Sequence, residues 1–267
     1  RQYELTGNKS DQTIATFFWE TMVHNHSYVI GGNSNYEYCG EAGKLNDRLS
    51  DNTCETCNTY NMLKLTRHLF GWQPSALLMD YYERALYNHI LASQNPENGM
   101  MTYFVPLRMG TKKQFSDQFN TFTCCVGSGI ENHAKYAEQI YSYDGKNNLY
   151  VNLFIPSVLN WKEKNIRITQ TNYIPESKQV RLVVIATTPT SFTFKIRKPS
   201  WSAATAVIKV NNNPVKTETD AAGYLTTTRV WKNGDVVTVN LDMNLYTEAM
   251  PDNPNRIAFK YGPVVVA

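Results

Sequence analysis

The second half of the chain is the part whose fold is most restricted by its sequence. After about residue 146, short segments of β-branched and aromatic residues follow one another closely. They read NLYVNLFI, IRITQTNYI, QVRLVVIAT, SFTFKIRK, TAVIKV, YLTTTRV and VVTVNL. Turn-forming strings such as NNNP, DAAG and KNGD separate several of them, as is typical of antiparallel strands. This succession predicts an antiparallel β-sandwich or barrel.

The first half of the chain has a helical period instead. Apolar residues recur every three or four positions in four stretches, from Ser10 or Asp11 to residue 22, at about 55–70, from Pro74 to residue 90, and at 128–142. Two long Gly- and Asn-containing stretches without that period, 27–53 and 95–118, lie between them, and loops this long are often functional. We predict a helical domain at residues 1–146 and a β-sandwich domain at residues 147–267.

Composition excludes several classes of protein. Hydrophobic residues make up 42% of the chain and charged residues 18%, which is enough apolar content to bury a core. The net charge is +3 and the basic residues are scattered, so we expect no nucleic-acid partner. No apolar run reaches the ~18 residues of a membrane span. The chain begins RQYELTGNKS, without Met or a signal-peptide pattern, and we expect it to be part of a longer protein.

The cysteines are the strongest indication of chemistry. All five lie in the helical half, at Cys39, Cys54, Cys57, Cys124 and Cys125. The number is odd and the β half has none, so the pattern favours metal binding or catalysis over a disulfide framework.

Two cysteine pairs could share one metal ion. The string CETC at 54–57 and the adjacent thiols at 124–125 could supply four thiolates to a structural zinc ion. Glu55 lies inside the first string, so a shell of one glutamate and three cysteines is the alternative. The pattern alone leaves both shells open, and any cysteine outside the shell is expected to be an ordinary buried residue.

Longer strings resemble a known family. GGNSNYEYC, ETCNTYNMLKLTRHLFGW, TFTCCVGSGIENHAKYAEQIY, LYVNLFIPS, FTFKIRKPSW and YGPVVVA are similar to the β-L-arabinofuranosidase-like glycoside hydrolases of families 127 and 146. The resemblance covers most of the chain. It implies the C-terminal part of an (α/α)6 barrel followed by an antiparallel β-sandwich, a multidomain fold of helices and strands. The N-terminal half of the barrel has no counterpart here.

The resemblance also implies roles for particular residues. A Zn²⁺ ion would be held by Glu55, Cys57, Cys124 and Cys125, and Cys124 would also be the nucleophile. The general acid/base would be a glutamate of the loop before ETC, for which Glu37 is the candidate and Glu41 the competitor.

These residue types suit retaining glycoside hydrolysis. The reaction needs a nucleophile on the anomeric carbon and an acid on the leaving oxygen. A thiolate can be that nucleophile, and a bound metal ion ionises the thiol. The glycines of GSG at 127–129 are expected to allow a tight turn before a helix whose dipole favours a thiolate. The resemblance further places Tyr103 against the sugar.

The resemblance implies a zinc-dependent hydrolase of β-L-arabinofuranosidic linkages in plant-derived glycans. Its partner would be an arabinose-containing oligosaccharide or glycan, and a periplasmic or secreted bacterial location is preferred. The alternatives are an inactive carbohydrate-binding or structural fragment with a zinc site and a zinc-structured module with no sugar role.

Overall fold

The computed structural model describes residues 1–202 and 206–266, which form two compact units. Unit 1 consists of Arg1–Pro74, Tyr81–Tyr136 and Tyr246–Ala267, and unit 2 of Ser75–Asp80 and Ala137–Leu245. Helices and antiparallel sheets both occur, so the predicted mixed, multidomain class is confirmed. The boundary placed at residue 146 stays a prediction. Thr205, the first residue of one predicted strand, lies outside the described residues.

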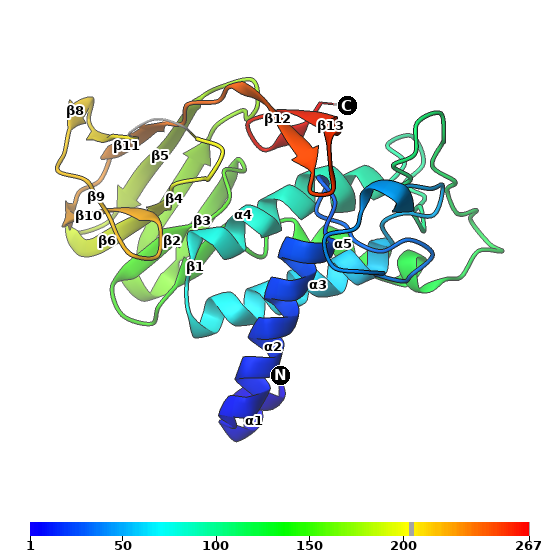
Figure 1. Ribbon diagram of the computed structural model, residues 1–267. Helices are drawn as coiled ribbons and strands as arrows, with labels where there is room; N and C mark the ends of the chain where they lie inside the picture. The colour runs from blue at the N-terminus through cyan, green and yellow to red at the C-terminus, as the bar shows by residue number, and fades with distance from the viewer. Residues whose placement is uncertain (203–205, 267) are drawn as a thin grey trace. The chain divides into compact units, whose positions relative to one another are not determined.

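Helices make up most of the regular structure of unit 1, although α4 begins in unit 2 (Figure 1). The α-helices are α1 (Gln2–Thr6), α2 (Lys9–Thr21), α3 (Thr56–Trp72), α4 (Ala76–Ala85) and α5 (Cys124–Lys135). The π-helical segments η1 (Met22–His26) and η3 (Leu86–Ile90) continue α2 and α4, and η2 (Asn46–Arg48) and η4 (Leu91–Ser93) are 3-10 turns.

Local contacts explain where the first helices lie. The Asn8 side chain accepts a hydrogen bond from the backbone N–H of Ser10, so Asn8 caps α2 rather than the expected Ser10 or Asp11. The Trp19 indole N–H donates to Thr66 Oγ1 at 2.8 Å and joins α2 to α3 inside the core. The α3 helix matches the helix predicted at 55–70 to within two residues at each end.

The α5 helix differs from its prediction at both ends. It begins at Cys124, four residues before the expected start, so the GSG glycines lie within the helix. Gly129 allows close packing instead of a turn, because a Cβ there would lie 2.4 Å from Met101 Cγ. The helix ends at Lys135, well before residue 142, and strand β1 (Tyr141–Tyr143) follows.

From Tyr246 onward, unit 1 also contains a three-stranded sheet of β12 (Leu245–Met250), β13 (Asn253–Tyr261) and β14 (Val264–Val265). Arg84 forms a bidentate pair with Glu248 of β12. The backbone N–H of Val265 donates to Asn88 Oδ1 at 2.8 Å. These contacts join the last strands to the α4–η3 region of the same unit.

Unit 2 is built on two sheets with one shared core. The first has the order β1, β2 (Asn148–Val151), β6 (Thr190–Arg197), β10 (Tyr224–Trp231), β9 (Glu218–Thr219). The second has the order β3 (Ser157–Trp161), β4 (Ile166–Thr171), β5 (Gln179–Ala186), β11 (Val236–Asn240), β7 (Ile208–Val210), β8 (Asn213–Pro214). Neighbouring strands are antiparallel except β2 and β6, which run parallel.

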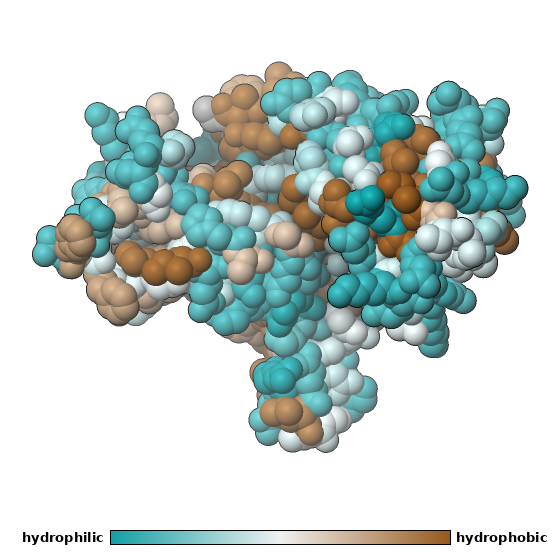
Figure 2. Space-filling model, turned by 180° about the vertical axis from the view of Figure 1, so that it is seen from behind, coloured by the Kyte–Doolittle hydropathy of each residue, from teal (hydrophilic) through white to brown (hydrophobic). Residues whose placement is uncertain are grey.

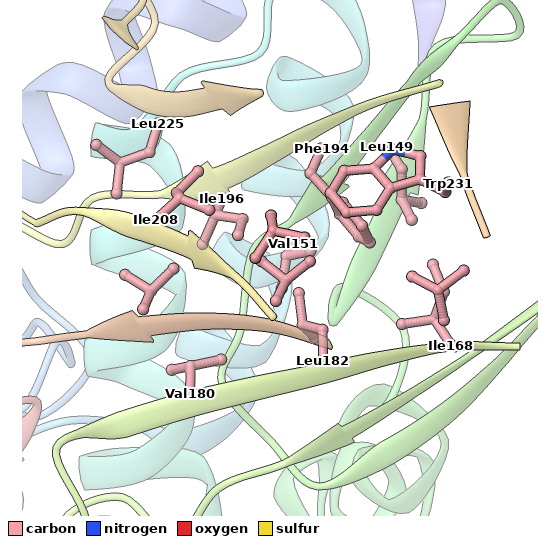
Figure 3. Close-up of a cluster of buried hydrophobic side chains, with 14 of the residues drawn as sticks. Leu149, Val151, Ile168, Val180, Leu182, Phe194, Ile196, Ile208, Leu225 and Trp231 are labelled. Carbon is pink, nitrogen blue, oxygen red and sulfur yellow. The ribbon is translucent and has the colours of Figure 1, made fainter. Parts of the chain in front are cut away.

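Alternating side chains bring the two sheets together. Along β5, Val180, Leu182 and Val184 are buried, whereas Arg181 between them is exposed. They meet residues of the other sheet such as Phe194 in a single apolar cluster (Figure 3). The segment QVRLVVIAT was therefore correctly predicted as a strand, and the two sheets pack as is typical of a β-sandwich.

The first two helices leave apolar side chains in solvent. Leu5, Ile14, Phe17 and Phe18 are about half to two-thirds exposed, and apolar atoms are visible on the lowest part of Figure 2, which α1 and α2 form. Among the described residues, no helix combines the length and the apolar character needed to cross a membrane.

Candidate functional site

Four side chains that could hold a metal ion meet where α3 and α5 begin. Glu55 precedes the first residue of α3 and Cys57 lies in its first turn. Cys124 and Cys125 are the first two residues of α5. One ligand atom from each of the four lies within 4.8 Å of the others. The fold thus brings together two segments almost 70 residues apart.

The sulfur atoms are in direct contact. Cys57 Sγ lies 3.3 Å from Cys124 Sγ and 3.1 Å from Glu55 Oε1. The Sγ atoms of Cys124 and Cys125 are 4.0 Å apart. The backbone N–H of Cys57 donates to Cys125 Sγ at 3.4 Å, as expected at a helix N-terminus that faces a sulfur. Cys125 is fully buried, whereas Cys124 is exposed.

This donor set fits a zinc ion. Three thiols and one carboxylate are ligands that zinc prefers, in the number of a tetrahedral site. Burial raises the pKa of the Cys125 thiol to about 12, and burial together with the contact to Glu55 raises the pKa of the Cys57 thiol well above its usual range. These thiols therefore stay protonated at neutral pH unless a cation offsets the desolvation. Cys54, the fourth thiol of the all-cysteine alternative, is fully buried in a separate apolar cluster.

Tyr103 joins the candidate acid to the candidate nucleophile. Its hydroxyl donates a short hydrogen bond to Glu37 Oε1, and Cys124 Sγ donates to the same hydroxyl at 3.6 Å. The hydrogen bond to Glu37 raises the pKa of Tyr103, so the phenol keeps its proton. Glu41 is exposed and is not a partner of Tyr103. The structure thus brings Glu37, and not its competitor, into this group.

Glu37 lies in a strained turn. The backbones of Asn35 and Tyr38 bond each other in both directions, at 3.0 and 3.1 Å. The two residues between them, Tyr36 and Glu37, have φ values of 50° and 67°. This is the geometry of a type I′ turn, in which Gly, Asn and Asp are the usual residues. Strain of this kind concentrates at functional sites.

Backbone hydrogen bonds hold the three loops of the site together. The N–H of Tyr36 donates to the Asn52 carbonyl at 3.0 Å, and the N–H of Thr56 donates to the Tyr103 carbonyl at 2.9 Å. The segments that carry Glu37, Glu55 and Tyr103 are therefore neighbours through their main chains, and not only through side chains.

A cavity of about 530 Å³ lies beside this group in unit 1. Tyr103 and Thr123, the residue before the cysteine pair, form part of its wall. Polar residues such as Gln114, Ser116 and Thr121 form much of the rest. The volume falls within the range of small-molecule sites, and the lining offers hydrogen-bond partners for hydroxyl groups.

Sequence reasoning did not single out Gly32 or His89, which lie beneath the Glu37 loop. Gly32 lies within the string GGNSNYEYC but was given no role of its own, and His89 is spaced like an ordinary helix-packing residue. The π-helical turn that contains His89 is not visible in the sequence.

Comparison with known proteins gives one consistent result. Residues 1–138 match the family model for the catalytic domain of GH127 β-L-arabinofuranosidase, and residues 148–243 match the model for its middle domain. The chain is 24% identical to a non-reducing end β-L-arabinofuranosidase of Bifidobacterium longum subsp. longum. That alignment covers 98% of this chain and 41% of the relative.

Solved structures share the fold. A GH127 β-L-arabinofuranosidase from Geobacillus stearothermophilus T6 has a TM-score of 0.83 and 21% identity. A second GH127 β-arabinofuranosidase has a TM-score of 0.86 and 23% identity. Each comparison covers 98% of this chain and 44% of the other. The chain thus spans less than half the length of the relatives it matches.

Proposed function

The chain belongs to the GH127 β-L-arabinofuranosidase family, and on this premise we propose that the protein is a retaining glycoside hydrolase. Its substrate is a β-L-arabinofuranosidic linkage in an arabinose-containing plant glycan. The observation that supports this most is the contact of Cys124 and Glu37 with the same Tyr103 hydroxyl. We also propose that the helices form the C-terminal part of an (α/α)6 barrel.

Cys124 and Glu37 have different roles in the two steps of the reaction. Cys124 Sγ attacks the anomeric carbon while Glu37 protonates the departing glycosidic oxygen, which leaves a thioglycosyl link to the protein. Glu37 then removes a proton from water, and the water hydroxyl displaces Cys124 and restores both groups. A retaining pair acts at a separation of about 5–5.5 Å, and contact with one shared hydroxyl keeps the two groups close.

Glu55, Cys57, Cys124 and Cys125 would hold a zinc ion, whose charge ionises the thiols when it is bound. Exposure separates the roles of the two adjacent cysteines. Cys124 is exposed and can meet a sugar, whereas Cys125 is buried and serves only as a ligand.

Tyr103 orients the reacting groups. Its hydroxyl holds one oxygen of Glu37 and contacts the sulfur of Cys124, and a sugar that enters between them displaces one of these contacts. Tyr103 is therefore proposed as a substrate-binding residue, with the adjoining cavity as space for part of the glycan.

The test is the turnover of an aryl β-L-arabinofuranoside by the full-length protein and its Cys124→Ala variant. Removal of the nucleophile should lower kcat by about 10³-fold or more. Cys39→Ala is the matched control, because Cys39 is half-buried outside the metal-ligand group. An arabinofuranose-configured covalent inhibitor should add its mass to Cys124.

Two results would contradict the proposal. One is turnover by Cys124→Ala close to that of the unmodified protein, and the other is an adduct on a different residue. Sugar binding without turnover by the unmodified protein would favour the inactive carbohydrate-binding alternative. A zinc content near zero in reduced protein would exclude the metal site.

A further inference from the structure

A buried histidine supports the loop that carries Glu37. His89 is fully buried in η3 and has no role in the proposed mechanism. Its ring lies against Gly32, where a Cβ would be 2.5 Å from His89 Nδ1 and 2.7 Å from Cys54 Cβ. Real Cβ atoms do not approach other atoms so closely, because the overlap is strongly repulsive. Only glycine therefore fits at position 32.

Gly31, the residue before Gly32, packs on the same helical region. A Cβ on Gly31 would lie 2.8 Å from both Cα and Cβ of Ala85, at the end of α4. The Tyr81 hydroxyl donates to the Gly31 carbonyl at 3.1 Å. Two successive glycines thus place the loop directly on α4 and η3, five residues before Glu37.

Cys54 connects this support to the metal-ligand group. It is fully buried, has a φ of 59° and directly precedes Glu55. Its N–H donates to the Ser34 carbonyl at 3.2 Å, and its carbonyl accepts from the Val105 N–H at 3.2 Å. One residue is therefore bonded to the Glu37 loop on one side and to the Tyr103 segment on the other.

The His89 ring is a buried, neutral spacer. Burial lowers its pKa to about 4, although the nearby Cys54 backbone opposes the shift. The ring is thus uncharged at neutral pH, and within the described part of the chain no ion pair explains its burial. Its position follows from the π-helical turn, a local widening of the helix that is frequent near functional sites.

We propose that His89, Gly32 and Cys54 form a positioning contact that sets the place of Glu37 relative to Cys124. The inference rests on the proposed function and deepens it by assigning positioning residues to the acid/base. His89 itself exchanges no proton with the substrate. The contact includes none of the four proposed metal ligands, although Cys54 directly precedes Glu55, so zinc content is measured together with activity to show that a change there acts on Glu37.

The test compares substrates that differ in their need for an acid. An alkyl β-L-arabinofuranoside needs protonation of its leaving oxygen, whereas a 2,4-dinitrophenyl β-L-arabinofuranoside does not. In the full-length protein, Gly32→Ala should lower kcat/KM about 100-fold for the alkyl substrate and less than about threefold for the dinitrophenyl substrate. The acid limb of the alkyl pH profile should shift, while zinc content stays unchanged.

Gly71→Ala is the matched control, because this glycine is exposed and a Cβ there meets nothing within 4 Å. It should leave both rates unchanged. His89→Asn is a second variant, which removes part of the His89 ring from the contact. It should lower activity on the alkyl substrate selectively, and it tests the contact even if Gly32→Ala does not fold. Hydrogen exchange of residues 32–38 should rise in both altered proteins and not in the control.

The outcomes separate the two proposals. Equal losses on the two substrates, or kinetics of Gly32→Ala that match Gly71→Ala, overturn the positioning contact. If the unmodified protein cleaves neither substrate, the proposed function fails. Hydrogen exchange then decides the inference by itself, and unchanged exchange at 32–38 in Gly32→Ala overturns it.

Discussion

At the scale of single residues, the turn that carries Glu37 conflicts with its own sequence. Positions with positive φ favour Gly or Asn, and a bulky residue there is strained by about 1–2 kcal/mol. The chain has Tyr36 and Glu37 at those positions. The strain is understandable for Glu37, whose carboxylate meets Tyr103. Tyr36 is 57% exposed and has no such reason.

We predict that Tyr36→Asn stabilises the protein by about 0.5–1 kcal/mol, because Asn tolerates left-handed backbone with less strain. Thermal unfolding measures the change as a higher Tm. Tyr38→Asn is the control, since Tyr38 is also exposed but lacks a positive φ. An equal effect in both variants would show that loss of an exposed ring, and not the backbone, is responsible.

The same turn shows what the sequence alone could not decide. Glu37 and Glu41 are both acidic residues in a glycine-rich loop, and only the family resemblance favoured Glu37. The choice depends on backbone bonds between Tyr36 and Asn52, which are contacts between distant residues. Local pattern carries no information about them. The role of Glu37 stays a prediction, although its contact with Tyr103 supports it.

At the scale of elements, the prediction of a turn at GSG, residues 127–129, was wrong because these residues lie inside α5. Three small residues after the cysteines predicted a turn, but the structure continues the helix through them. Gly129 is there because α5 packs closely on Met101. As a result Cys124 and Cys125 lie in the first turn of the helix, where free N–H groups favour negative charge.

Two glycines in α5 give a matched pair for testing this packing. A Cβ on Gly127 meets nothing within 4 Å, whereas one on Gly129 meets Met101 at 2.4 Å. Gly127→Ala should stabilise the helix by about 0.5–1 kcal/mol through its propensity. Gly129→Ala should destabilise the protein, since overpacking costs about 1–3 kcal/mol.

Chemical denaturation of the two α5 variants measures the difference, which should be at least about 1 kcal/mol. Similar stabilities would mean that Met101 moves aside without loss. In that case, adding Met101→Ala to Gly129→Ala should not restore any stability. If Gly129→Ala is destabilising because it overpacks against Met101, the double variant should recover part of the lost stability.

At the scale of the whole molecule, the spacing of apolar residues predicted helices and strands better than it predicted which segments pack against one another. The α3 helix and strands such as β5 and β6 were expected from apolar spacing alone. The π-helical turn at His89 and the attachment of Glu248 to Arg84 were not. Both depend on packing between segments far apart in the chain, which overrides local propensity.

His89 should make stability depend on pH. The unfolded chain binds a proton at His89 near pH 6.5, but burial holds the folded pKa at about 4. Between these values the unfolded state binds more protons, so stability falls as pH falls. From pH 7.5 to pH 5 the free energy of unfolding should decrease by about 2 kcal/mol from this group.

Urea unfolding at several pH values, with a chelator present to remove the contribution of metal ligands, checks this dependence. His89→Asn should be less stable at neutral pH and should show a flatter decline. A decline of equal steepness in His89→Asn would assign the pH dependence to other groups.

The 3.3 Å contact between the sulfurs of Cys57 and Cys124 also makes the site vulnerable to oxygen. Two thiols at that distance need only small shifts to join when an oxidant takes their two electrons. The product would remove the proposed nucleophile and a proposed metal ligand together, while the buried Cys125 is less accessible. A bound metal ion would hold the same two sulfur atoms, so air oxidation is expected only after the metal has been lost. Protein purified aerobically with chelator should therefore lose activity that a reductant and zinc, added together, restore.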